Sequence, residues 1–507
     1  MRGVVVEGLC RVTKSQSIQI LTFTTLAIGF LALLTDTSTT NLSLFSLPSL
    51  PWAWNPSSFS FLSSAPSPPP SPPPPPPTTN PNMDLYPTFT NPKKQKAVEK
   101  LVKDLDEETM MRRGNERDKN MVKIEADLAT ARALIKDAIF KSRDSPPLAQ
   151  DADYFPCGQI YRNSYVFQRS YMLMEKMMKI YVYEEGEPPL FHYGPTKNIY
   201  STEGIFIGLI ESNTSHFRTH DPNQAHLYFL PFSVVMILQH LFDPVERDKA
   251  VLGRVIGDYI ATVSAKYPYW NRSLGADHFM LSCHDWGPRA TWYVHHLYFT
   301  SIRALCNANT SEFFNPRKDV SFPEINLPVG DISGLTTPGS PNRTILAFFA
   351  GRLHGKIRKS IFEHWKEKDK DIIVWEEVPK ESKFSYKEMM GRSKYCICPS
   401  GFEVASPRIV EAIYAECVPI LVSENYVLPF SDVLDWDKFS IQVTVAELPE
   451  LKRILAAVGD DGYMVLRRRV KKVQHHFVVN DPPKRYDVFN MMLHSLWLRR
   501  LNLRINM

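Results

Sequence analysis

SKYCICPSGFEVASPRIVEAIYAECVPILVSENYVLP, residues 393–429, is the stretch from which the fold can be worked out. Tyr395–Cys398 is a short apolar run that ends at a Pro-Ser-Gly loop, and Val418–Val422 is a second run rich in β-branched residues. Between them, Ser406 and Pro407 have the pattern of a helix start, an N-cap residue followed by proline at the first helical position. The stretch therefore predicts strand, loop, helix and strand, which is the repeating unit of a parallel α/β sheet.

The loop and helix start of this stretch suit a phosphate group. A helix N-terminus offers unpaired backbone N–H groups and the positive end of a dipole, and both attract anions. Arg408 lies in the first turn and Glu411 shares its face, so a cation for phosphate oxygens stands beside a carboxylate that can accept from ribose hydroxyls. On spacing alone, an ordinary ion pair on a solvated crossover helix is an equally open interpretation.

The composition and the first residues bound the class of protein. The chain has 507 residues, enough for two domains with appendages, and its net charge of +5 lacks the strong basic excess of a nucleic-acid-binding protein. Ile18–Leu34 is uncharged and long enough to cross a bilayer, although signal peptides share this shape. Arg2, Arg11 and Lys14 precede it against the single acid Glu7, which predicts a cytosolic N-terminus and a lumenal body.

Two further features fit a lumenal body. Glycosylation sequons stand at Asn41, Asn213, Asn271, Asn309 and Asn342. An even number of cysteines follows the anchor, in a compartment that permits disulfides, namely Cys157, Cys283, Cys306, Cys396, Cys398 and Cys417. Their connectivity stays open, except that Cys396 and Cys398 point the same way on one strand and make a poor pair.

Strands and helices alternate through the rest of the chain. Pro66–Pro77 must form polyproline II, and 93–143 is highly charged with apolar residues at helical spacing. Strand-like runs follow at Lys179–Tyr183, His226–Phe232, His278–Ser282, Thr344–Ala350 and Ile372–Trp375, and helical patterns at Ile199–Ile210, Asp248–Lys266 and Lys356–Glu367. The Pro- and Gly-rich interval Phe322–Pro341 is typical of a linker, so two α/β halves facing a cleft are expected.

From Cys157 to about Val458 the chain resembles the plant exostosin-like glycosyltransferases, which are similar to the animal exostosins that polymerise heparan sulfate. The blocks that carry the resemblance are KIYVYEEGEPP at 179, STEGIF at 201, DPNQAHLYFLPF at 221, YPYWNRSLGADHFMLSCHDWGP at 267, LAFFAGRLHGKIR at 346 and the opening stretch. The resemblance implies a GT-B fold, a type II Golgi membrane protein, and inverting transfer of a sugar from a UDP-sugar donor to a cell-wall polysaccharide, pectin or hemicellulose. The branch it looks most like contains a pectin xylosyltransferase.

This resemblance gives each segment an expected role. We expect a cytosolic tail at 1–17, a signal-anchor at 18–35, a Pro-rich disordered stem at 36–92, a charged helical stem at 93–150, an acceptor-side α/β domain at 151–330, a nucleotide-sugar-binding α/β domain at 331–462 and C-terminal helices at 463–507. The stem helix is a candidate for association with a second copy or another chain.

The resemblance also assigns the donor site to the carboxyl half. It implies that Arg408 and Glu411 bind the nucleotide and that Ser400 and Gly401 bring backbone N–H groups to the pyrophosphate. Arg352 follows a strand and a glycine, so it should emerge at the cleft and balance the charge of the leaving diphosphate. Weaker candidates for the same task are Arg358 and Lys394.

Inverting transfer needs a base for the acceptor hydroxyl. Asp277, His278, His284 and Asp285 flank a strand of the amino half, and we favour Asp285, then His284. Aromatic residues of this half could stack on sugar rings or pack in the core, namely Tyr267, Tyr269, Trp270, Trp286 and Trp292.

No cofactor is expected beyond the UDP-sugar substrate. The two Asp-x-Asp sequences, at 104–106 and 435–437, stand in the stem and in an expected turn, so transfer is predicted to need no metal. The competing interpretation is a non-catalytic partner that binds glycan or tethers another Golgi glycosyltransferase.

Overall fold

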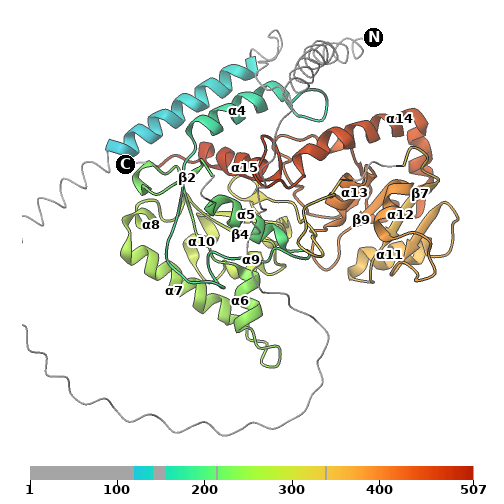
Figure 1. Cartoon of the computed structure of the whole chain (residues 1–507), viewed down its shortest axis with the longest axis horizontal. Coiled ribbons are helices and arrows are strands. Elements are labelled where there is room, and N and C mark those ends of the chain that lie inside the picture. Colours follow the sequence, from blue (N-terminus) through green and yellow to red (C-terminus); the bar gives the residue numbers. More distant parts are fainter. Residues whose placement is uncertain (1–118, 141–155, 213–214, 337–339, 506–507) are drawn as a thin grey trace, which may run out of the picture. The chain divides into compact units, whose positions relative to one another are not determined.

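The computed structural model describes residues 119–140, 156–212, 215–336 and 340–505, and these contain two separate parallel sheets (Figure 1). The expected anchor, the Pro-rich stem, Asn41 and Asn213 lie outside the described residues. Within the described ranges, no helix combines the length and apolar character needed to cross a membrane.

The first sheet has six strands in the order β2-β1-β3-β4-β5-β6, all paired in parallel. Its strands are β1 (Ile180–Val182), β2 (Arg218–Thr219), β3 (Leu227–Phe229), β4 (His278–Ser282), β5 (Ile302–Leu305) and β6 (Val320–Ser321). The helices of this half are α4 (Ser164–Met177), α5 (Ser201–Glu211), α6 (Val234–Leu241), α7 (Ala250–Lys266), α8 (Pro268–Ser273), α9 (Gly287–Ala290) and α10 (His295–Phe299), with 3-10 turns η1 (Pro222–Gln224) and η2 (Thr310–Glu312).

The second sheet has five strands in the order β11-β10-β9-β7-β8, again all parallel. Its strands are β7 (Ile345–Ala350), β8 (Ile372–Trp375), β9 (Ser393–Pro399), β10 (Val418–Val422) and β11 (Ile441–Gln442). The helices of this half are α11 (Gly355–Trp365), α12 (Tyr386–Arg392), α13 (Arg408–Tyr414), α14 (Leu451–Val473) and α15 (Val488–Asn502), with 3-10 turns η3 (Trp436–Lys438), η4 (Val445–Glu450) and η5 (Gln474–His476).

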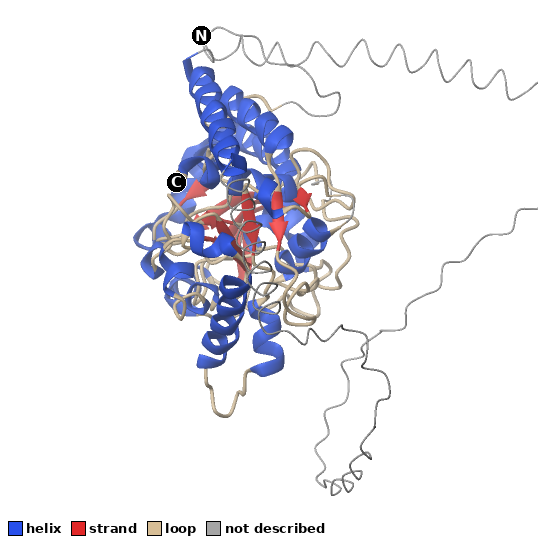
Figure 2. Cartoon of the chain, turned by 90° about the vertical axis from the view of Figure 1, so that its left-hand side faces the viewer, coloured by secondary structure: helices blue, strands red, loops and turns tan. Residues whose placement is uncertain are grey.

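Burial explains why these runs became strands. Every residue of β4 and β10 is buried, as expected for strands of a parallel sheet that helices cover on both faces (Figure 2). The sequence-based prediction of a parallel α/β architecture is therefore confirmed. The start of α13 differs from the prediction: the helix begins at Arg408 after Pro407, and the buried hydroxyl of Ser406 makes no hydrogen bond within the described residues, so Ser406 does not cap it.

The last helix returns to the first sheet. Helix α15 packs against β5, β6 and α4, and its Trp497 is fully buried. Arg500 Nε donates to the His226 carbonyl at 2.8 Å, and Arg500 Nη2 lies 2.5 Å from Glu125 Oε1 on a helix over residues 119–140. This charged helix therefore docks on the body through α15.

Two disulfides lie inside the halves. Cys283 pairs with Cys306 and joins the ends of β4 and β5, while Cys396 pairs with Cys417 and joins β9 to the loop before β10. Cys398 is buried and unpaired, in agreement with the prediction that Cys396 and Cys398 do not form a pair.

Candidate active site

A cavity of about 560 Å³ opens where the carboxyl ends of both sheets meet. Asp285 follows β4, Glu324 follows β6, Gly351 follows β7 and Glu403 follows β9, and all four line it. Ligands of open α/β sheets bind at this edge, and the volume is in the range of cofactor and substrate sites.

Two arginines share one wall of this cavity. Arg408 Nε donates to the Ala350 carbonyl at 3.1 Å, and its guanidinium packs so closely over Gly351 that a Cβ atom there would collide with Arg408 Nη2. Arg358 Nη1 donates to the Arg352 carbonyl at 3.2 Å.

Arg358 is a buried cation close to a second cation, Arg408. It is 9% exposed, and its Nε has no hydrogen-bond partner among the described residues. Burial, followed by the neighbouring charge of Arg408, lowers the pKa of Arg358 to about 10. Two guanidinium groups that repel each other in a half-buried cavity would both be stabilised by an anion.

Glu411 stands in the same wall with a fixed orientation. Its Oε1 accepts from Asn326 Nδ2 at 2.9 Å, and its Oε2 accepts from the Tyr386 hydroxyl at 2.9 Å. A carboxylate can accept further bonds, so Glu411 is still able to receive hydroxyl groups of a ligand. Arg408 and Glu411 thus face the cavity from α13, together with Arg358 from α11.

The amino half contributes two carboxylates to the lining, Asp285 and Glu324. Burial raises the pKa of Asp285, while a hydrogen bond from the Tyr200 hydroxyl opposes the rise. Glu324 is 6% exposed, and none of the described residues donates a hydrogen bond to it. Burial, then the charge of Asp285, holds the pKa of Glu324 well above its usual range, so Asp285 ionises before Glu324.

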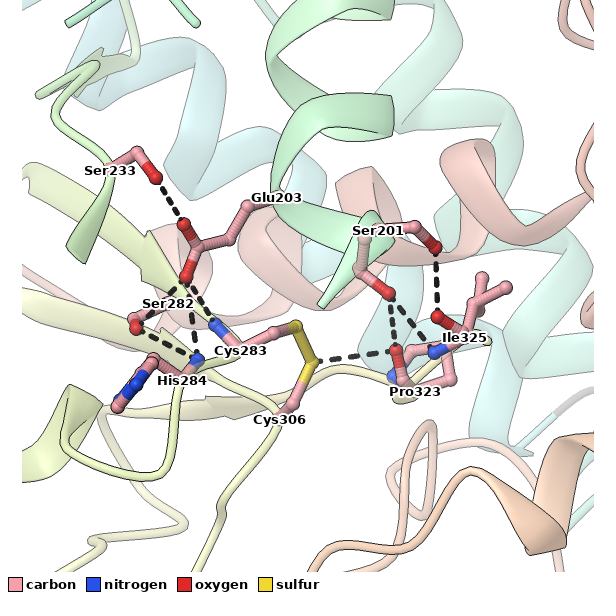
Figure 3. Close-up of a disulfide and its surroundings, with 10 residues drawn as sticks. Ser201, Glu203, Ser233, Ser282, Cys283, His284, Cys306, Pro323 and Ile325 are labelled. Carbon is pink, nitrogen blue, oxygen red and sulfur yellow. Dashed lines mark hydrogen bonds between the residues drawn. A yellow bond between two sulfur atoms is a disulfide. The ribbon is translucent and has the colours of Figure 1, made fainter. Parts of the chain in front are cut away.

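Three consecutive residues at the start of α5, Ser201, Thr202 and Glu203, fix the backbone next to both carboxylates. Figure 3 shows the contacts of Ser201 and Glu203. Glu203 is fully buried and accepts from the Cys283 N–H at 2.8 Å, the Ser282 hydroxyl at 3.1 Å and the Ser233 hydroxyl at 2.5 Å. This fixes the loop that leads to Asp285. Ser201 and Thr202 hydroxyls donate to the carbonyls of Ile325 and Pro323, which flank Glu324, at 2.8 and 2.9 Å.

A second cavity of about 350 Å³ adjoins the first and shares Asp285 and Glu403 with it. Asn307 Nδ2 donates to Glu403 Oε2 at 2.7 Å and lies 3.4 Å from the Asp285 carbonyl, so it ties the amino half to the loop after β9. Burial, then the charges of Glu312 and Asp285, raises the pKa of Glu403 to about 7. A carboxyl group that titrates near neutrality therefore lies at the junction of the two cavities.

Three residues predicted for the donor site do not take the expected role, although Gly401 does line the cavity. The Ser400 N–H donates to the Val422 carbonyl and the Gly401 N–H to the Glu403 carbonyl, so neither amide is free for a pyrophosphate, and that prediction needs correction. Lys394 pairs with Asp460 at 2.8 Å and does not line the cavity, because it begins β9 and therefore lies at the opposite edge of the sheet.

Two other candidates, Arg352 and His284, do not line the first cavity. Arg352 is on the rim, with its side chain 76% exposed and paired with Glu377 at 2.9 Å. The ring of His284 is half-buried, and burial lowers its pKa to about 4. Because His284 Nδ1 accepts the Trp286 N–H at 2.9 Å, the neutral ring carries its proton on Nε2, which makes it a poor base.

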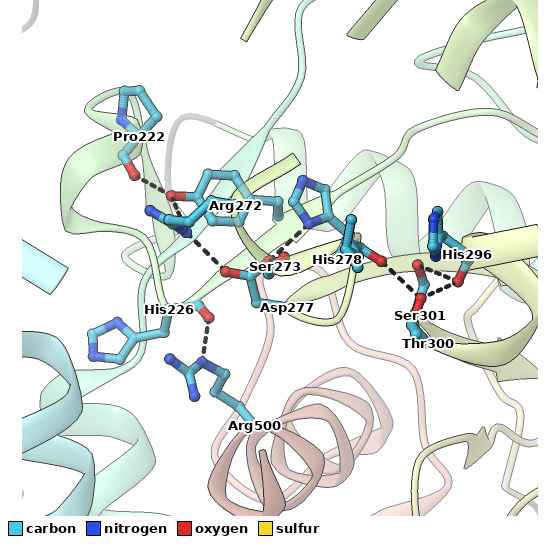
Figure 4. A network of polar contacts seen from close by, with 12 residues as sticks. Pro222, His226, Arg272, Ser273, Asp277, His278, His296, Thr300, Ser301 and Arg500 are labelled. Carbon is cyan, nitrogen blue, oxygen red and sulfur yellow. Dashed lines mark hydrogen bonds and ion pairs between the residues drawn. The ribbon is translucent and has the colours of Figure 1, made fainter. Parts of the chain in front are cut away.

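Asp277 and His278 serve the fold (Figure 4). Asp277 accepts from Arg272 at 2.8 Å, from Ser273 at 2.6 Å and from His278 at 2.8 Å, at the start of β4 and hence at the edge away from the cavity. Burial opposes ionisation, but the His278 hydrogen bond and the Arg272 charge together hold the pKa of Asp277 well below its usual range.

Some of the aromatic candidates lie in the core and others line a cavity. Tyr269 and Trp270 are buried in the core, and Tyr269 stacks on Tyr228. Trp286 and Trp292 instead line the second cavity.

The sequons that the structure describes differ in exposure. Asn271 and Asn342 are exposed. Asn309 is only 9% exposed, and its Oδ1 accepts from the Ser311 N–H at 3.0 Å. Burial does not favour a glycan at Asn309, and glycosylation of these sequons stays a prediction.

No cluster of three or more metal-ligand side chains occurs in the part of the chain that the structure describes. The Asp-x-Asp at 435–437 forms a turn, in which Asp437 accepts from Gln442 at 2.7 Å and Asp435 lies 3.8 Å from Lys438 Nζ.

Sequence reasoning missed Glu324 and Glu403 and ranked Arg358 too low. Glu324 lies in the interval expected to be a linker, although Phe322, Ile325 and Leu327 are buried. These apolar residues follow no regular spacing, so no local sequence pattern marked the acid between them.

The sequence of this chain is similar to those of known proteins. Residues 174–458 match the Exostosin GT47 domain. A probable glycosyltransferase of Arabidopsis thaliana is 65% identical over 386 residues, which cover 76% of this chain and 82% of the relative. A probable beta-1,4-xylosyltransferase of the same plant is 25% identical over 300 residues, covering 56% of this chain and 72% of the relative.

Among solved structures, the crystal structure of TarM aligns with 41% of this chain and 53% of its own at a TM-score of 0.24 and 9% identity, too weak a likeness for an argument about fold. The family match spans more than half of the chain, and the first relative spans more still. The chain therefore belongs to the exostosin GT47 family of glycosyltransferases.

Proposed function

We propose that this protein is an inverting glycosyltransferase of GT-B type that transfers a sugar from a UDP-sugar to a cell-wall polysaccharide, pectin or hemicellulose. The observation that carries the proposal is the cavity at the sheet edges, which Arg408 and Arg358 line from the carboxyl half and Asp285 and Glu324 from the amino half. The cations of one half suit a leaving diphosphate, and the carboxylates of the other suit proton removal.

The donor would lie against the carboxyl half. Arg408 and Arg358 would bind the diphosphate oxygens, and their mutual repulsion would be relieved by the ligand. Glu411, held by Asn326 and Tyr386, would accept from ribose hydroxyls. These guanidinium groups supply the positive charge at the diphosphate, so we expect transfer to proceed in EDTA.

The acceptor would enter from the second cavity and meet the donor at Asp285. The acceptor hydroxyl gives its proton to the Asp285 carboxylate as its oxygen attacks the anomeric carbon. The bond from that carbon to the diphosphate breaks, and the electron pair leaves with the UDP. Asp285 suits this role because it lines both cavities and ionises before Glu324.

The location is proposed from the sequence. The uncharged run at 18–34 behind basic residues favours a single-pass type II Golgi protein with a lumenal body. The helix at 119–140 belongs to the expected stem. It buries Leu128 and Ala131 against the body, and its exposed Val122 and Phe140 offer a surface for association with another chain.

UDP binding by the full-length protein tests the proposal. Calorimetry should give a dissociation constant in the micromolar range typical of substrates, and a panel of UDP-sugars with pectic and hemicellulosic acceptors should give transfer with one donor. If UDP does not bind at millimolar concentration, the protein is a non-catalytic partner instead.

A further inference from the structure

The second cavity has a wall of exposed aromatic side chains. Trp292 is 56% and Phe313 67% exposed, and both line the cavity beside the half-buried Trp286. Large apolar groups left in contact with water mark a binding surface. Flat rings of this kind suit the C–H faces of pyranose sugars.

Two cations cover these rings. Lys249 Nζ lies 4.0 Å from the centre of a Trp286 ring, and the Arg289 guanidinium lies 5.8 Å from that of Trp292. Neither forms an ion pair with any residue that the structure describes. Other cations of the chain are neutralised by nearby acids, for example Lys266 by Glu185 at 2.6 Å. Lys249 and Arg289 are therefore available to an anionic ligand.

Three carboxylates also line this cavity, Asp285, Glu312 and Glu403. Asp285 and Glu403 are shared with the first cavity, and Asn307 Nδ2 links Glu403 at 2.7 Å to Glu312 at 3.5 Å. Asp285 and Glu403 thus mark the junction where the reacting hydroxyl would lie, whereas the unpaired cations lie over tryptophans that line the second cavity alone.

We infer that the acceptor is a carboxylate-bearing glycan, a uronic-acid polysaccharide. The sugar next to the reacting one stacks on Trp286 and Trp292, and its carboxylate binds Lys249 and Arg289. This rests on the proposed function, and deepens it by naming the acceptor class. A neutral polysaccharide would leave both cations unused.

The test compares two probes on the full-length protein: a hexamer of α-1,4-linked galacturonic acid, and the same hexamer with every carboxyl group methyl-esterified. Calorimetry should show the acidic hexamer binding at least about tenfold more tightly, because charge-assisted hydrogen bonds exist only in that form. The preference should shrink as salt rises from 50 to 300 mM. The double variant Lys249→Met, Arg289→Met should lose it.

Lys359→Met is the matched control, since it removes an exposed cation of α11 that pairs with Glu363 and lies outside both cavities. It should keep the full preference. UDP binding is measured on every variant, so a failure of the donor site is recognised separately. With UDP still bound, equal affinity for the two hexamers, no binding of either, or a preference that survives the double variant would each overturn the inference.

Discussion

Replacing Arg408 by Ala should abolish most of the affinity for UDP. The guanidinium lies over Gly351 in the wall of the cavity and can direct two donors at a diphosphate. Each charge-assisted hydrogen bond contributes about 1.5 kcal/mol or more, so losing two costs about 3 kcal/mol and raises the dissociation constant of UDP about 100-fold. The fold loses only the bond to the Ala350 carbonyl, about 1 kcal/mol.

Calorimetry of UDP binding, with thermal unfolding of the same samples, measures both effects. Arg408→Lys keeps the charge without the fork and should weaken binding about tenfold. Arg352→Ala, on the exposed rim, is the matched control and should change the dissociation constant by less than about threefold. If UDP binds Arg408→Ala as well as the native protein, the diphosphate lies elsewhere. If the variant unfolds, Arg408 is structural.

Three further predictions concern the catalytic base, a disulfide and a buried ion pair. Asp285→Asn should lower kcat by about 100-fold or more. Glu403→Gln should stay active and leave the acid limb of the kcat/KM profile in place, because Glu403, with a pKa of about 7, is already neutral at the pH where Asp285 ionises. A Glu403→Gln enzyme as inactive as Asp285→Asn would make Glu403 the base. Replacing both Cys283 and Cys306 by Ser should lower the free energy of unfolding by about 3 kcal/mol in urea titrations, as the loop between them is no longer closed, and unchanged stability would show that the bond does not form. Asp277→Asn should lower the free energy of unfolding by about 3 kcal/mol. Because the pKa of Asp277 is depressed in the folded protein, the native protein has this stability above about pH 4 and loses it as the pH falls further. Equal pH dependence of Tm in both proteins would refute the assignment.

The strands that could be predicted are those with the longest buried runs. The bounds of β4 and β10 match the predicted runs, because a strand covered on both faces reads as a continuous buried segment. The bounds of β8 match as well, although it lies at the edge of its sheet and is buried only at alternate residues. Strands β2 and β11 have two residues each and leave no period to detect.

The site could be predicted where its residues directly follow a strand or open a helix. Arg408, Glu411 and Asp285 were found in this way, and all line the cavity. Glu324 was missed because its character comes from burial between α5 and the two halves, which no local pattern encodes. The error at Gly401 has the opposite cause, since a local bond to the Glu403 carbonyl takes the amide that a phosphate would need.

The most direct test is an experimental structure of the full-length protein with UDP bound. We predict the diphosphate between Arg408 and Arg358, with the ribose hydroxyls at Glu411 and the terminal phosphate facing Asp285. UDP bound outside this cavity, or with its diphosphate directed away from both arginines, would contradict the account.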